Sequence, residues 1–103
     1  MFAPWGARMR ARLRHAGISY NDGTFGFYDT GAMVEPLVLR QLENLADGKV
    51  TEFYFHPATR PTETLTRQMP GYRNVEEFAT LCSPHIRDAL RRLEIEAVAF
   101  RDL

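Results

Sequence analysis

The sequence of 103 residues has one cysteine, Cys82, and no apolar run long enough to span a membrane. A single cysteine excludes an internal disulfide and a metal cluster held by thiolates, and it fits a reducing compartment. The amino-terminal residues do not resemble a signal peptide, because the arginines from Arg8 to Arg14 interrupt any apolar segment. We therefore expect a cytoplasmic protein without a membrane span.

Net charge is also absent, since 13 basic and 13 acidic side chains cancel. No overall field would draw the chain to nucleic acid or to an anionic membrane, so a nucleic-acid partner is not expected. The local run Arg8, Arg10, Arg12 and Arg14 spreads around a helix, which favours a solvated face over a phosphate site. The apolar content of 45% is enough for one core and excludes disorder by composition.

Familiar catalytic and metal-binding signatures are missing as well. The sequence has no Ser-His-Asp order, no glycine-rich phosphate loop and no Cys-x-x-Cys pair. His15 and His85 are not spaced with His56 as metal ligands would be, and Cys82 is interpreted as a small buried hydrophobe. No metal ligands are therefore predicted within this chain.

The most informative segment is Thr-Glu-Phe-Tyr-Phe-His-Pro at positions 51–57. Its aromatic and β-branched residues predict a buried strand, and Pro57 must end that strand because proline lacks the N–H that a ladder needs. His56 is thereby placed at the carboxyl end of a strand, where α/β proteins bind ligands. An imidazole there can act as an acid, a base or a ligand, or it can simply bond a neighbouring loop carbonyl.

The remaining pattern predicts helices alternating with strands, which indicates an α/β fold with few parallel strands and crossover helices. So few strands make an incomplete sheet, so we interpret residues 1–103 as a single partial domain of a larger α/β structure. Helices are expected over residues 4–16 and 34–46, then from an N-cap at Asn74 through Val75, Phe78 and Leu81, and again from the cap Ser83 with Pro84 as first helical residue to Leu93. Strands are expected over 49–56 and 97–100, short strands or loops over 18–20 and 24–28, and a long loop over 57–72. The strands at 49–56 and 97–100 are expected to pair in parallel.

Three further residues are candidates for substrate binding. Asp22 either bonds its own backbone in a turn or contacts substrate, and Phe25 either provides an apolar wall of a sugar site or packs in the core. Arg73 either reaches a substrate oxygen or holds a carboxylate within the fold, and the second role is favoured.

The segments also resemble a known family. The strand that ends in His56-Pro57, the tail from Tyr72-Arg73 through Leu81-Cys82-Ser83-Pro84 to residues 100–103, and the spacing between these blocks are similar to the YdjC-like carbohydrate deacetylases. The form His56-Pro57-Ala58 resembles the hopanoid-biosynthesis-associated branch most closely. The resemblance is firm from about residue 50 onward and looser before it.

The resemblance implies a (β/α)-barrel-like fold and removal of acetyl groups from N-acetylated sugars with a divalent metal, Mg²⁺ or Zn²⁺. The family's aspartate and histidine ligands lie in segments before the His-Pro strand, and nothing in this chain matches them. The chain would therefore be the carboxyl-terminal third or so of such an enzyme, inactive by itself, with His56 as general acid or oxyanion-stabilising group and a small N-acetylated sugar as partner. Self-association into a homo-oligomer is left open. The alternative is a non-catalytic α/β module that binds a protein partner through open sheet edges.

Overall fold

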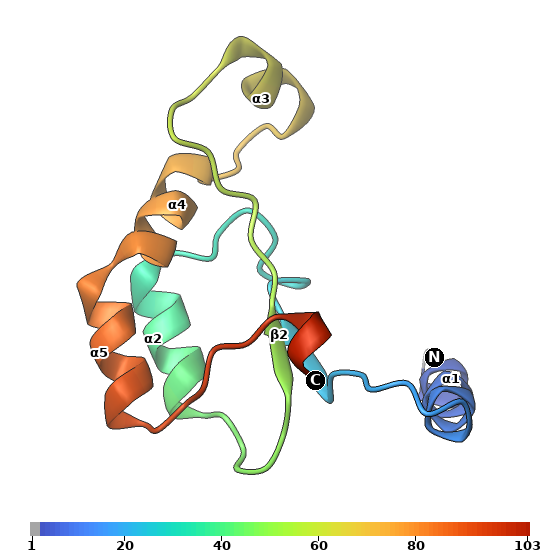
Figure 1. The fold of residues 1–103 in the computed structure, drawn as a ribbon. Helices are drawn as coiled ribbons and strands as arrows, with labels where there is room; N and C mark the ends of the chain where they lie inside the picture. The colour runs from blue at the N-terminus through green and yellow to red at the C-terminus, as the bar shows by residue number, and fades with distance from the viewer. Residues whose placement is uncertain (1–2) are drawn as a thin grey trace.

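The computed structural model describes residues 3–103, which form a mixed α/β arrangement of five α-helices and a two-stranded parallel sheet. Figure 1 shows the elements in chain order. They are α1 (Ala3–His15), β1 (Gly23–Phe25), α2 (Glu35–Glu43), β2 (Thr51–Phe53), α3 (Glu63–Gln68), α4 (Asn74–Cys82), α5 (Pro84–Arg92) and a closing 3₁₀ turn, η1 (Phe100–Asp102).

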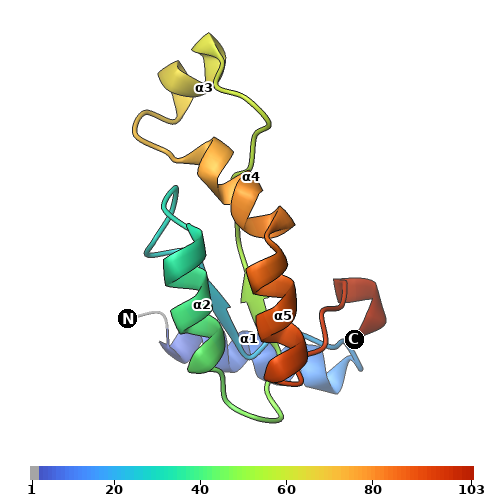
Figure 2. The ribbon, with the colours of Figure 1, turned by 90° about the vertical axis from the view of Figure 1, so that its left-hand side faces the viewer.

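The sheet is a β-α-β unit, in which β1 and β2 run parallel and α2 makes the crossover between them. The register pairs Gly23 with Thr51 and Phe25 with Phe53. Both strands point toward the end of the molecule where α4 begins (Figure 2). The predicted class, few parallel strands joined by a crossover helix, is therefore confirmed at this level.

The predicted pairing of residues 49–56 with 97–100 is wrong, because β2 pairs with β1 and residues 96–99 form no strand. Val98 and Phe100 remain half exposed, and the sheet found within residues 3–103 contains β1 and β2 alone. The segment instead turns into η1, where the Asp102 carboxylate accepts the Ala99 N–H at 3.1 Å. A short apolar run without a strand neighbour had no partner for its backbone groups.

Other boundaries also differ from the predictions. Residues 18–20 form no strand, and β2 is only three residues long because β1 offers only three residues to pair with. The long loop of residues 57–72 contains α3, whose N-cap Thr62 accepts the Leu65 N–H at 3.1 Å. Cys82 is exposed, so its interpretation as a buried hydrophobe is wrong.

The core lies between the sheet and helices α2 and α5. Its buried apolar residues are Met33, Val38, Leu42 and Ala89, and Phe25, Phe53 and Phe55 pack against them from the sheet side. In Figure 1 the helices α2, α4 and α5 all lie on one side of the strands, whereas α1 stands apart from this layer. Within residues 3–103, no helix has the length and apolar character to cross a membrane.

Candidate functional site

His56 follows β2 and lies on the face of the sheet opposite the core. Phe53 and Phe55 pack against the core, and side chains alternate along an extended chain, so Tyr54 and His56 belong to the other face. Their rings confirm this, since they meet edge to face with centroids 4.8 Å apart. Thr24 and Glu52 share that face, where the Thr24 hydroxyl lies 3.4 Å from the Glu52 carboxylate.

Two tyrosines flank the imidazole. Tyr54 contacts it from β2's own continuation, and Tyr72 approaches it edge to face from the segment before α4, with centroids 5.2 Å apart. Within residues 3–103 the buried Nδ1 of His56 has no hydrogen-bond partner. The alternative in which the ring bonds a loop carbonyl through Nδ1 is therefore not realised among these residues, and this buried nitrogen has no partner there.

The backbone of His56 is held by the first turn of α4. Its N–H donates to Oε1 of Glu77 at 2.7 Å, and its carbonyl accepts from Nδ2 of Asn74, also at 2.7 Å. The prediction that Asn74 is a helix N-cap is wrong, because Asn74 is the first helical residue and Arg73 is the N-cap. The asparagine side chain is thus free to bind the strand end instead.

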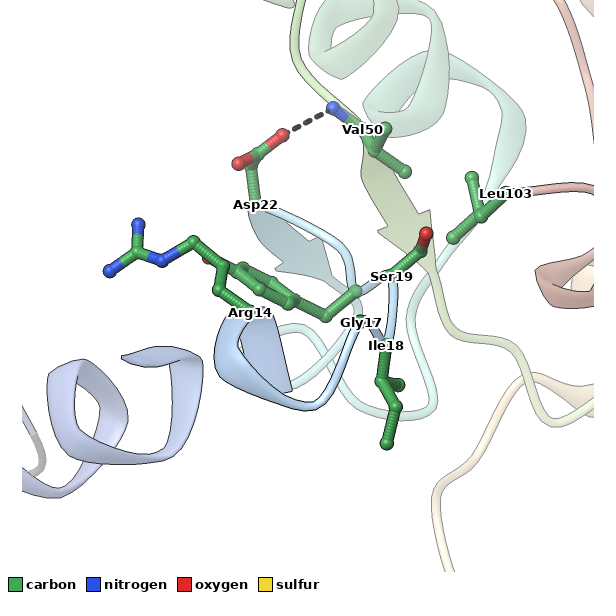
Figure 3. Close-up of a pocket in the computed structure, with 8 residues that line it drawn as sticks. Arg14, Gly17, Ile18, Ser19, Asp22, Val50 and Leu103 are labelled. Carbon is green, nitrogen blue, oxygen red and sulfur yellow. Dashed lines mark hydrogen bonds between the residues drawn. The ribbon is translucent and has the colours of Figure 1, made fainter. Parts of the chain in front are cut away.

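Asp22 lies at the amino end of β1, away from His56. Its carboxylate accepts the Val50 N–H at 2.7 Å, which ties the approaches to the two strands together (Figure 3). A hollow of about 460 Å³ opens beside it, lined by residues of the 14–22 segment together with Val50 and Leu103. Because this hollow lies at the amino ends of the strands, Asp22 and His56 cannot serve one small substrate in this arrangement.

Phe25 packs on the core side of the sheet. Its ring lies 5.3 Å from that of Phe53, and both contact the buried cluster beneath α2 and α5. His56 occupies the opposite face, so the structure separates these two predicted site residues and favours core packing for Phe25.

Arg73 is close to the site through its neighbours Tyr72 and Asn74. Its Nε donates to Glu76 at 3.0 Å, and this hydrogen bond raises the pKa of the Arg73 guanidinium and lowers that of the Glu76 carboxyl. The contact is the structural role that the sequence favoured. Arg73 also lines a hollow of about 200 Å³ between the α3 segment and the start of α4, together with Tyr72 and Asn74. A substrate oxygen in that hollow would have to share the guanidinium with Glu76.

A second polar cluster joins α2 to α5. The Ser83 hydroxyl donates to Oε1 of Glu35, and Nδ1 of His85 lies 3.2 Å from Oε2 of the same carboxylate. Serine and histidine both bond the glutamate rather than each other, so the imidazole cannot remove the serine proton as it would in a catalytic triad. Glu35, Ser83 and His85, which we call the helix clip, therefore link the start of α2 to the start of α5.

The residues present do not fit a metal ion. Across residues 3–103, no three histidine, cysteine, aspartate or glutamate side chains come together as a ligand set. The buried oxygens nearest His56 belong to Glu77, and backbone N–H groups occupy both of them.

Three neighbours of His56 were not predicted from the sequence: Tyr54, Asn74 and Glu77. Tyr54 could have been found, because a residue two positions before His56 on a strand must share its face. Glu77 could not, because an acidic residue in a first helical turn is ordinarily explained by the helix dipole.

Comparison with known proteins gives one match. The profile of the family described as YdjC-like protein matches residues 1–92. Searches of curated proteins and of solved structures gave no match. A match over most of the sequence shows the family, and it agrees with the resemblance carried by the His56-Pro57 strand and the tail. The chain belongs to the YdjC-like family, which suggests a function related to carbohydrate deacetylation.

Proposed function

We propose that this chain is the carboxyl-terminal part of a metal-dependent carbohydrate deacetylase that hydrolyses N-acetyl groups of amino sugars, in the hopanoid-associated branch. The observation that carries the proposal is the position of His56. Its imidazole follows a parallel strand at the carboxyl end, on the face away from the core. Family membership supplies the reaction class.

In this proposal His56 delivers the proton that the departing amine needs, or stabilises charge on the carbonyl oxygen. The amine that departs in amide hydrolysis is a poor leaving group until its nitrogen is protonated. A positioned imidazole is well suited to supply that proton near neutral pH. Tyr54 and Tyr72 limit the orientations of the ring. The divalent metal, Mg²⁺ or Zn²⁺, and its ligands are proposed to belong to segments preceding this chain, since the residues described here do not fit an ion.

The test is a His56→Ala change in the enzyme that contains the upstream segments, assayed for acetate release from N-acetylated sugars. General acid–base help is typically worth about 10²–10⁴-fold, so kcat should fall by that range while metal content stays unchanged. The His85→Ala variant is the matched control, because this second imidazole lies in the helix clip. A folded, metal-loaded His56→Ala enzyme with near-normal kcat would refute the catalytic role.

The alternative function, a module that binds a protein through its sheet edges, is favoured by one feature. The sheet contains only β1 and β2, so within residues 3–103 each strand has one unpaired edge. The genomic sequence before Met1 discriminates the two. A continuous frame carrying an Asp-Asp segment and histidines supports the enzyme, whereas a clean start signal without such a frame supports the module.

A further inference from the structure

We propose that Glu77, assisted by Asn74, is the positioning residue that fixes His56 for proton transfer; this rests on the proposed function of His56. Glu77 touches the backbone of His56 and not its ring, so its role is to orient the imidazole and not to react.

The peptide groups of His56 need partners that the sheet does not provide. The ladder ends at Phe53, with Tyr54 making the last contact to β1, and Pro57 has no N–H to continue it. Glu77 takes the N–H and Asn74 takes the carbonyl, both at 2.7 Å. The two side chains are three residues apart on α4, so one helical turn holds both sides of the same residue.

Burial makes the Glu77 carboxylate a rigid anchor. It is 0% exposed, and the ion pairs found within residues 3–103 do not include it. Its second oxygen accepts the Met33 N–H at 3.2 Å. A buried carboxylate requires such donors, because an unsatisfied charge is costly.

The anchor joins the two loops that follow the strands. Met33 lies after β1 and His56 after β2, and Glu77 bonds one N–H from each. Backbone bonds around it repeat the connection, since Arg73 donates to the Gly31 carbonyl at 2.7 Å and Ala58 donates to the Asn74 carbonyl at 3.1 Å. The carboxyl ends of both strands are therefore registered against the start of α4. A shift of α4 would disturb the backbone of His56 through its hydrogen bonds to the Glu77 and Asn74 side chains.

The Glu77→Gln change isolates this role, because an amide keeps the shape but offers a single oxygen and places NH₂ against a second N–H. Amide hydrogen exchange on this chain is the first measurement. The His56 and Met33 amides should be protected in the wild type, and at least one should exchange about tenfold faster in Glu77→Gln, since a charge-assisted bond is lost. The Val38 amide in α2 should not change. Glu76→Gln is the matched control on the adjacent, exposed glutamate.

If Glu77→Gln does not fold, the Asn74→Ala variant still tests the proposal. It removes only the bond to the His56 carbonyl and should loosen residues 56–58 while leaving α4 intact. An unprotected His56 amide in the wild type, or full protection in both variants, would overturn the proposal.

The second measurement uses the complete enzyme. Glu77→Gln should lower kcat about 10–100-fold with little change in KM, because misplacing a catalytic group by about 1 Å has effects of that size. In a His56→Ala background the same change should have no further effect on kcat. If kcat falls in His56→Ala but stays normal in Glu77→Gln, the positioning role of Glu77 is overturned and the proposed role of His56 stands. Normal His56→Ala would instead refute the proposed function, and the positioning role with it.

Discussion

Gly31 allows Tyr72 to reach His56. Its φ is +80°, a region that favours glycine, and a Cβ built there would lie 2.6 Å from the Tyr72 ring. Gly48 has a similar φ of +72°, but nothing lies within 4 Å of its Cβ position. Alanine at either position would strain the backbone, but only at Gly31 would its methyl group also collide with the Tyr72 ring.

We expect Gly31→Ala to lower the free energy of unfolding by about 1–3 kcal/mol more than Gly48→Ala, because the added methyl group must displace a packed ring. Denaturant unfolding of the two variants measures the difference. Equal losses would mean that Tyr72 moves aside without cost and does not hold His56 in place.

At the residue scale, the face on which His56 lies could be predicted, because alternation along the chain is local. The predicted strand end at His56-Pro57 is wrong, since β2 ends at Phe53, where its pairing with β1 stops. The partners of the His56 backbone could not be predicted, because Glu77 and Asn74 come from a helix about 20 residues later, and only the packing of α4 brings them near. The role of Phe25 could not be predicted either. An aromatic residue near a turn can line a binding site or pack in the core, and only the face of the sheet decides between them.

At the scale of elements, the Ser83-Pro84 signal was reliable, whereas the cap predicted at Asn74 and the short strands were not. Ser83-Pro84 predicted the start of α5, and Ser83 does cap that helix by accepting the His85 N–H at 3.1 Å. Strand formation depends on a neighbour, which the sequence of one strand does not contain. Residues 97–100 have the composition of a strand but form none. The segment expected as a strand or a loop over residues 24–28 contributes only its start to β1, which pairs with β2.

The clip between α2 and α5 gives the fold a pH dependence. Hydrogen bonds from Ser83 and then His85 lower the pKa of Glu35 below its ordinary value of 4.5. A folded pKa below the unfolded one contributes stability that is complete above pH 4.5 and is lost as pH falls through the folded value. We therefore expect the stability of Glu35→Gln to fall less than that of the wild type as the pH is lowered.

Thermal unfolding across the acid range measures this effect. The wild type should lose Tm more steeply than Glu35→Gln below pH 4.5, and Glu96→Gln, at an exposed position, should follow the wild type. If Tm falls equally steeply below pH 4.5 in the wild type and in Glu35→Gln, the hydrogen bonds to Glu35 do not form in solution.

On the scale of the whole molecule, the chain is extended for its length. Its radius of gyration is 15.7 Å, against about 13 Å for a compact domain of this size. The excess comes from α1 and α3, which make no extensive contacts with the other helices and strands among residues 3–103. Exposed apolar side chains on α1, Trp5 and Met9, agree with this separation. The folded core is then the β1–α2–β2 unit with α4 and α5.

This division predicts unequal effects of shortening the chain at its two ends. Removing residues 1–16 should change the free energy of unfolding by less than about 0.5 kcal/mol, as surface changes usually do. Removing residues 95–103 should cost about 1–3 kcal/mol, because Ile95 packs against the core and its N–H bonds the Leu90 carbonyl at 2.8 Å. Urea unfolding followed by circular dichroism compares the two truncated chains with the parent. An equal or larger loss on removing residues 1–16 would show that α1 packs on the core in solution, and that the core extends beyond the five elements assigned to it here.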